Sequence, residues 1–167
     1  MEVFEIKGDN GFVKIEIKEI FGFPDETSHF GGYECRADIE IKIPSYSAKG
    51  DFYTSTGQLF EFYEELKVCQ AQLKGEVKYL TFEGNFALKI KYTELGHVEI
   101  SGMFHQSMSN INCLEFEINS DQSFLNYTVE ELEVITSKYG NNKGVNRNLN
   151  LDSDKDDKSK NWKFWSK

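Results

Sequence analysis

The chain has 167 residues, of which 39% are hydrophobic and 14% aromatic. This length fits one domain with a substantial buried core, and the hydrophobic content excludes disorder along the whole chain. No apolar run approaches the roughly 20 residues of a membrane-spanning helix. The N-terminal stretch MEVFEIKGDN also lacks the basic and apolar regions of a signal peptide.

The charge of the chain is unevenly distributed. Residues 1–140 carry 24 acidic and 12 basic side chains, whereas residues 141–167 carry 4 acidic and 7 basic ones. Such an acidic body repels the phosphates of nucleic acids and attracts basic proteins. Solubility is a second explanation, because an excess of acid also serves that end. We expect neither nucleic acid nor a membrane as a partner.

Three cysteines, Cys35, Cys69 and Cys113, show no CxxC or other metal-binding spacing. Their odd number argues against a disulfide framework, and reduced thiols are typical of the cytosol. The sequence therefore predicts a cytoplasmic protein.

Alternation of apolar and polar residues predicts about eight strands in the first 120 residues. They lie near residues 3–7, 13–18, 33–43, 46–54, 76–82, 86–92, 98–104 and 114–118. Most connections are short turns rich in Gly and Asn, which favour an antiparallel meander over parallel crossovers. Residues 22–32 form a longer loop, GFPDETSHFGG, and loops of this length are often functional.

The stretch DFYTSTGQLFEFYEELKVC, residues 51–69, leads into a predicted helix over residues 56–74. Ser55 with Gln58 forms a capping box at its start, and Gly75 is a typical residue just after a helix end. Apolar residues fall on one stripe at helical spacing: Leu59, Phe62, Tyr63, Leu66, Cys69 and Leu73. Only Phe60 and Tyr53 remain free to face a partner.

A second capping box, Thr128 with Glu131, predicts a shorter helix that ends at Gly140 and directs Val129, Leu132 and Ile135 to the core. The expected fold is α+β, predominantly antiparallel β packed with two helices. Residues 1–140 form the predicted domain and residues 141–167 a flexible, charged tail. The tail ends in WKFW, Trp162–Trp165. The sequence leaves open whether this end docks on its own chain or on a second subunit.

No catalytic signature is present in the sequence: GxGxxG, GxxxxGK[ST], GxSxG and HExxH are all missing. His97 and His105 would lie about 26 Å apart on one strand, too far to share a metal. His29, in the long loop, is expected to be solvated. The run DSDKDD at residues 152–157 lacks the Gly and Glu that an EF-hand loop requires. We therefore predict no catalytic residue, no metal and no cofactor.

Several segments together resemble a family of small proteins from Bacillus-like bacteria, the WapI-type immunity proteins. The segments are GFPDETSHFGGYE, DFYTSTGQLFEFYEEL, YLTFEGNFALKIKY, GHVEISGMF and DQSFL, in this order. The resemblance covers residues 3–140 and leaves the tail outside. Its most specific parts, STGQLFEFYEEL and LTFEGN, are packing and turn signatures and not catalytic residues.

The resemblance implies a non-enzymatic cytosolic protein that neutralises a cognate toxin domain, often a nuclease. An acidic surface would suit such a basic partner and speed its encounter. On electrostatic grounds alone, the candidate contact residues are Glu34, Asp38 and Glu40 on one strand face, with Asp25 and Glu26 in the long loop.

Two other interpretations remain open at this point. A small-molecule-binding domain or enzyme would hold an apolar pocket between the sheet and the helix at residues 56–74. A homo-oligomer would pair exposed strands or tails between subunits. The immunity hypothesis predicts instead a flat or convex acidic patch.

Overall fold

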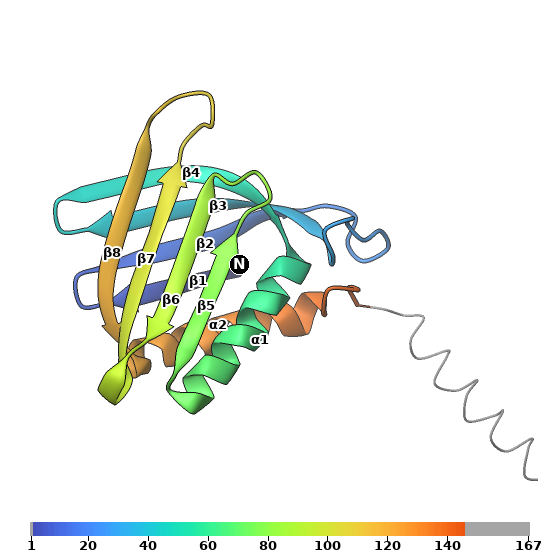
Figure 1. The fold of residues 1–167 in the computed structure, drawn as a ribbon. Helices are drawn as coiled ribbons and strands as arrows, with labels where there is room; N and C mark the ends of the chain where they lie inside the picture. The colour runs from blue at the N-terminus through green and yellow to red at the C-terminus, as the bar shows by residue number, and fades with distance from the viewer. Residues whose placement is uncertain (1, 146–167) are drawn as a thin grey trace, which may run out of the picture.

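The structure, a computed structural model, describes residues 2–145 and contains eight strands and two α-helices (Figure 1). Sheet A comprises β1 (Glu2–Gly8), β2 (Gly11–Ile20), β3 (Glu34–Ile43) and β4 (Tyr46–Ser55). Sheet B comprises β5 (Gly75–Leu80), β6 (Phe86–Tyr92), β7 (His97–His105) and β8 (Cys113–Asp121). The helices are α1 (Thr56–Gln72) and α2 (Gln122–Tyr139).

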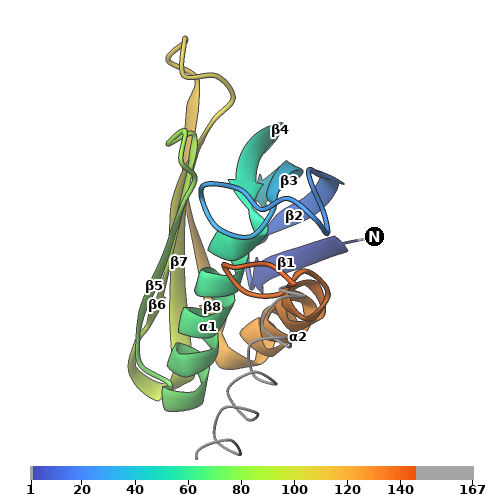
Figure 2. The same ribbon diagram turned by 90° about the vertical axis from the view of Figure 1, so that its right-hand side faces the viewer.

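Each sheet is an antiparallel meander in which strands follow one another in chain order. This confirms the predicted α+β class and its eight-stranded, meander-like arrangement. The division into two separate four-stranded sheets was not predictable from the strand pattern alone. In Figure 2 the sheets lie side by side, with sheet B forming one outer layer and α1 lying between it and α2.

The core lies between the inner faces of the two sheets. Alternation sends one side chain in two inward, and the inward residues are almost fully buried, such as Ile15 and Ile39 in sheet A and Ile90 and Ile100 in sheet B. Phe52 of β4 stacks on Phe86 of β6, with ring centroids 5.3 Å apart. This aromatic contact joins the two sheets directly.

Helix α1 begins where the sequence predicts. The Ser55 hydroxyl accepts a hydrogen bond from the backbone N–H of Gln58 at 3.2 Å, as an N-cap does. The side chain of Gln58 does not return to Ser55; its amide donates to the carbonyl of Leu80 in β5. The helix ends at Gln72 rather than Lys74, since Leu73 already adopts the left-handed conformation, with φ of 52°.

Helix α2 begins at Gln122, seven residues before the predicted first helical residue, so the prediction of a second capping box was wrong. Its N-cap is Asp121, whose carboxylate accepts from the backbone N–H of Ser123 at 2.7 Å. Thr128 lies in mid-helix, buried, and its hydroxyl donates to the carbonyl of Glu5 at 2.7 Å. The Glu131 carboxylate accepts from the backbone N–H of Glu5 at 2.8 Å. Both residues therefore bind the edge of β1 instead of capping a helix.

The long loop before β3 is held in place by aromatic contacts and by the turn after α2. The ring of Phe23 packs edge-on against Tyr33 and Tyr139, with centroids 5.1 and 5.0 Å away. The Tyr33 hydroxyl donates to the Pro24 carbonyl and accepts from the Val145 backbone N–H. The first residues of the predicted tail thus contact this loop. The rest of that tail, with Trp162–Trp165 and the acidic run at residues 152–157, lies outside the described residues.

Neither α1 nor α2, the two helices of residues 2–145, combines the length and the apolar character needed to cross a bilayer.

Candidate functional site

The acids predicted on β3 share the outer face of sheet A with several cations. Glu34, Asp38 and Glu40 point to this face, and Asp38 lies 3.4 Å from the Arg36 guanidinium and 3.7 Å from the Lys18 ammonium. Glu40 lies 3.2 Å from Lys49 on β4. Because these partners lie within ion-pair distance, Asp38 and Glu40 add little net negative potential to this face.

The remaining three candidate acids lie at one end of sheet A. Asp25 and Glu26 are exposed in the long loop, and both backbone N–H groups donate to the Gly22 carbonyl, at 2.8 and 2.7 Å. The exposed Glu34 follows the loop, and its carbonyl accepts from Phe21 at 2.8 Å. Among residues 2–145 none of these three carboxylates forms an ion pair. Since Glu40 is six residues from Glu34, about 20 Å along the strand, the five candidates form two groups and not one patch.

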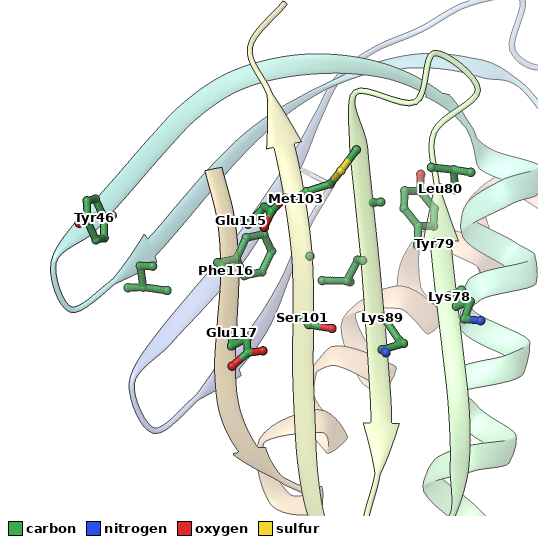
Figure 3. Close-up of a pocket in the computed structure, with 14 residues that line it drawn as sticks. Tyr46, Lys78, Tyr79, Leu80, Lys89, Ser101, Met103, Glu115, Phe116 and Glu117 are labelled. Atoms are coloured by element: carbon green, nitrogen blue, oxygen red, sulfur yellow. The ribbon is translucent and has the colours of Figure 1, made fainter. Parts of the chain in front are cut away.

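The outer face of sheet B is not covered by another helix or strand of the described chain, and Figure 1 views it from the front. Its outward side chains lie in three cross-strand rows, here called the sheet B face. The rows are Glu76, Lys91, Glu99 and Asn119; then Lys78, Lys89, Ser101 and Glu117; then Leu80, Ala87, Met103 and Glu115. The second and third rows line an open hollow of about 800 Å³ (Figure 3). The rest of its lining comes from Ile43 and Tyr46 of sheet A and from the neighbouring row of sheet B: Tyr79, Leu88, Gly102 and Phe116.

The charges of the sheet B face are separated across the strands. Lys78, Lys89 and Lys91 lie on β5 and β6, whereas Glu99, Glu115 and Glu117 lie on β7 and β8. Within the described part of the chain, the single ion pair on this face joins Lys78 to Glu76, at 2.9 Å. The hollow is deepest in the middle of the face, where Ala87 and Ser101 have small side chains. The strand pattern predicts that these residues point outward, but no local signal shows that this face is uncovered.

A pocket between sheet B and α1 was the alternative site. The space there measures about 160 Å³ and is lined by Gln58, Glu61, Phe62 and Glu65 of α1 with residues 78–80 of β5. Ligand pockets usually measure about 300–1,000 Å³, so this gap is too small for one.

The strongly shifted titratable groups are structural. Burial raises the pKa of Tyr79 and of Tyr92, whose hydroxyls bond to Thr54 and to Gln70. Burial, with the nearby Glu34 carboxylate, raises the pKa of the Cys35 thiol to about 12. His97 and His105 are the first and last residues of β7. Among residues 2–145, no three His, Cys, Asp or Glu side chains are grouped so that they could hold a metal ion.

Because the Cys35 thiol is buried, we expect the free energy of unfolding to fall at mildly alkaline pH. Its pKa is 9.0 in the unfolded chain and about 12 in the folded one. The contribution of this thiol to the free energy of unfolding is therefore fully present below pH 9. It is lost as the pH rises from 9 towards 12, because the unfolded state releases the proton first. Between pH 8 and 10 the free energy of unfolding should fall by about 1 kcal/mol from this thiol.

Urea titrations at both pH values measure this difference. The Cys35→Ala variant should show a smaller fall, whereas the exposed Cys113→Ala variant should match the wild type. An equal fall in all three proteins would rule out Cys35 as the cause.

Comparison with protein families identifies a match over most of the chain. The model of the immunity protein WapI-like family matches residues 4–140, which span the fold from β1 to the end of α2. This confirms the resemblance inferred from the sequence segments. Comparison with curated proteins finds no matching relative.

Proposed function

Because this chain belongs to the immunity protein WapI-like family, we propose that it binds a cognate toxin domain in the bacterial cytoplasm and neutralises it without catalysing a reaction. The family match over residues 4–140 carries this proposal. Binding alone can neutralise a toxin when it covers the groups that contact the toxin's substrate. A protein with this role needs a stable surface of suitable shape and charge, and no reactive centre of its own.

We propose that the loop end of sheet A meets this partner. Asp25, Glu26 and Glu34 lie near one another there, exposed and without ion pairs among the described residues. A nuclease toxin is basic where it grips phosphates, so these carboxylates would steer it and pair with it. Asp38 and Glu40 extend the surface along β3, but their cationic neighbours reduce their part in the attraction.

Co-expression with the candidate toxin domain tests the proposal. The domain to test is the C-terminal domain of any large secreted protein that proves to be encoded beside this gene, and the wild-type chain should rescue growth. The variant Asp25→Lys, Glu26→Lys, Glu34→Lys should bind that domain with an association rate lowered about tenfold at low salt and with a flatter salt dependence. The variant Asp38→Lys, Glu40→Lys should show a smaller effect. Stopped-flow association over a range of salt concentrations measures both.

A matched control places three similar substitutions elsewhere: Glu65→Lys, Glu94→Lys and Glu130→Lys, all at exposed positions. It changes the net charge by the same amount, so an equal loss in this control would show a general charge effect and remove the loop end from the interface. Failure of the correctly folded wild type to rescue growth would contradict neutralisation of that toxin domain.

A further inference from the structure

The sheet B face carries a pattern that is complementary to itself. Its β5–β6 half carries three lysines and Glu76, its β7–β8 half carries three glutamates, and small or apolar side chains lie in the middle. We propose that a second copy of this chain docks on this face. A two-fold axis relates the copies; it lies between their two facing B sheets and runs parallel to the strands. This proposal concerns a surface away from the loop end of sheet A and does not depend on toxin binding.

The choice of axis follows from the charges. A two-fold axis along the strands, between β6 and β7, places β5 of one copy over β8 of the other and β6 over β7, with each row over the same row. Lys78 then faces Glu117 of the second copy, and Lys91 faces Glu99. An axis across the strands would instead set β5 over β5 and β6 over β6. Lysines would then meet lysines, which costs free energy.

The middle of the face also fits a second copy. In the third row, Met103 of one copy lies over Ala87 of the other, and the reverse contact occurs on the other side of the axis. A long, flexible side chain therefore enters the space left by a small one. In the second row, Lys89 lies over the Ser101 hydroxyl. Both hollows of about 800 Å³ are in this way partly filled by Met103 and the lysine stems.

Charge outside the face favours this particular contact. The chain carries a net charge of −9, so two copies repel each other on most surfaces. The three lysines and the four glutamates of the sheet B face nearly cancel. The outer face of sheet A is also mixed, but four of its acids, Glu16, Glu19, Asp38 and Glu40, are already within ion-pair distance of cations in the same chain. The sheet B face keeps most of its charges available for a partner.

The size of the face sets the expected strength. Four strands about 4.8 Å apart, over about six residues of 3.3 Å each, give roughly 400 Å² per copy. Stable interfaces bury about 800 Å² per partner. The dimer should therefore be weak and in exchange with the monomer, and both dilution and salt should weaken the association further.

Sedimentation velocity on the full chain tests the pairing. At 50 mM salt and protein concentrations rising to about 1 mM, the weight-average mass should rise from 19.3 kDa towards twice that value. The variant Lys78→Glu, Lys89→Glu, Lys91→Glu makes the face wholly acidic and should stay monomeric. So should Glu99→Lys, Glu115→Lys, Glu117→Lys, which makes it predominantly basic. Mixing the two should restore a dimer that contains one copy of each, at least tenfold tighter than the wild-type pair.

The control variant Lys74→Glu, Lys143→Glu lowers the net charge away from the face and should keep most of the wild-type association. A wild type that remains at 19.3 kDa up to about 1 mM would overturn the proposal. So would mixed charge-reversal variants that stay apart while circular dichroism shows both folded. Dimerisation that Met103→Arg and Ala87→Arg leave unchanged would also exclude this face.

Discussion

Replacing Phe52 by alanine should lower the free energy of unfolding by about 3–5 kcal/mol. Phe52 is 1% exposed and its ring stacks on Phe86, which is fully buried in the other sheet. Alanine would leave a cavity at the point where β4 meets β6, and the facing sheets cannot close it without shifting their strands. For a domain of this size, such a loss is a large fraction of the total stability.

Chemical denaturation of Phe52→Ala, with circular dichroism as the signal, measures this loss. Tyr46→Ala is the matched control, because Tyr46 lies on the same strand but is 67% exposed. It should cost less than about 0.5 kcal/mol. Similar losses in the two variants would show that Phe52 does not link the sheets as described.

Replacing Gly57 by alanine should destabilise the protein by about 1–3 kcal/mol, although alanine favours a helix by about 1 kcal/mol over glycine. Gly57 lies in the first turn of α1, where a Cβ atom would lie 2.5 Å from the Gly31 carbonyl carbon and 2.6 Å from its oxygen. Backbone atoms cannot move aside as a flexible side chain does. The added methyl group must therefore push the long loop away from the helix.

The opposite substitution, Ala71→Gly, serves as the control, since Ala71 is exposed in the last turn of the same helix. It should cost about 0.5–1 kcal/mol, as helix propensity predicts. Because the loop carries Asp25 and Glu26, Gly57→Ala should also weaken binding of the toxin domain, whereas Ala71→Gly should not. A Gly57→Ala protein more stable than the wild type would contradict the close approach.

Much of the fold was predictable because its signals are local. Alternation along β3 placed Cys35, Ile39 and Ile41 inside, and all three are buried. Ser55 caps α1 as expected, since an N-cap depends only on residues within one turn. Leu73, the last residue of the predicted apolar stripe, is exposed because the helix ends before it.

The start of α2 shows where local signals fail. Thr128 and Glu131 have the spacing of a capping box, but β1, more than 120 residues earlier, takes both side chains. The sequence carries no local sign that the two segments meet. Asp121, the true cap, was included only in a motif of the family resemblance.

The candidate surfaces show the same limit. Sequence alternation placed Glu34, Asp38 and Glu40 on one strand face, yet the pairing of Asp38 with Lys18 and of Glu40 with Lys49 depends on strand register. The sheet B face depends on register and also on which layer α1 covers. Both are properties of the assembled fold, so residue spacing alone could not reveal them.

The contact between α2 and β1 has a consequence for synthesis on the ribosome. The unpaired edge of β1 is bonded by Thr128 and Glu131 only after about 130 residues have been made. Until then the nascent chain presents a strand edge able to pair with neighbouring chains. Chains truncated before Gln122 should therefore aggregate, and α2, by covering the edge of β1, should protect the finished chain from this aggregation.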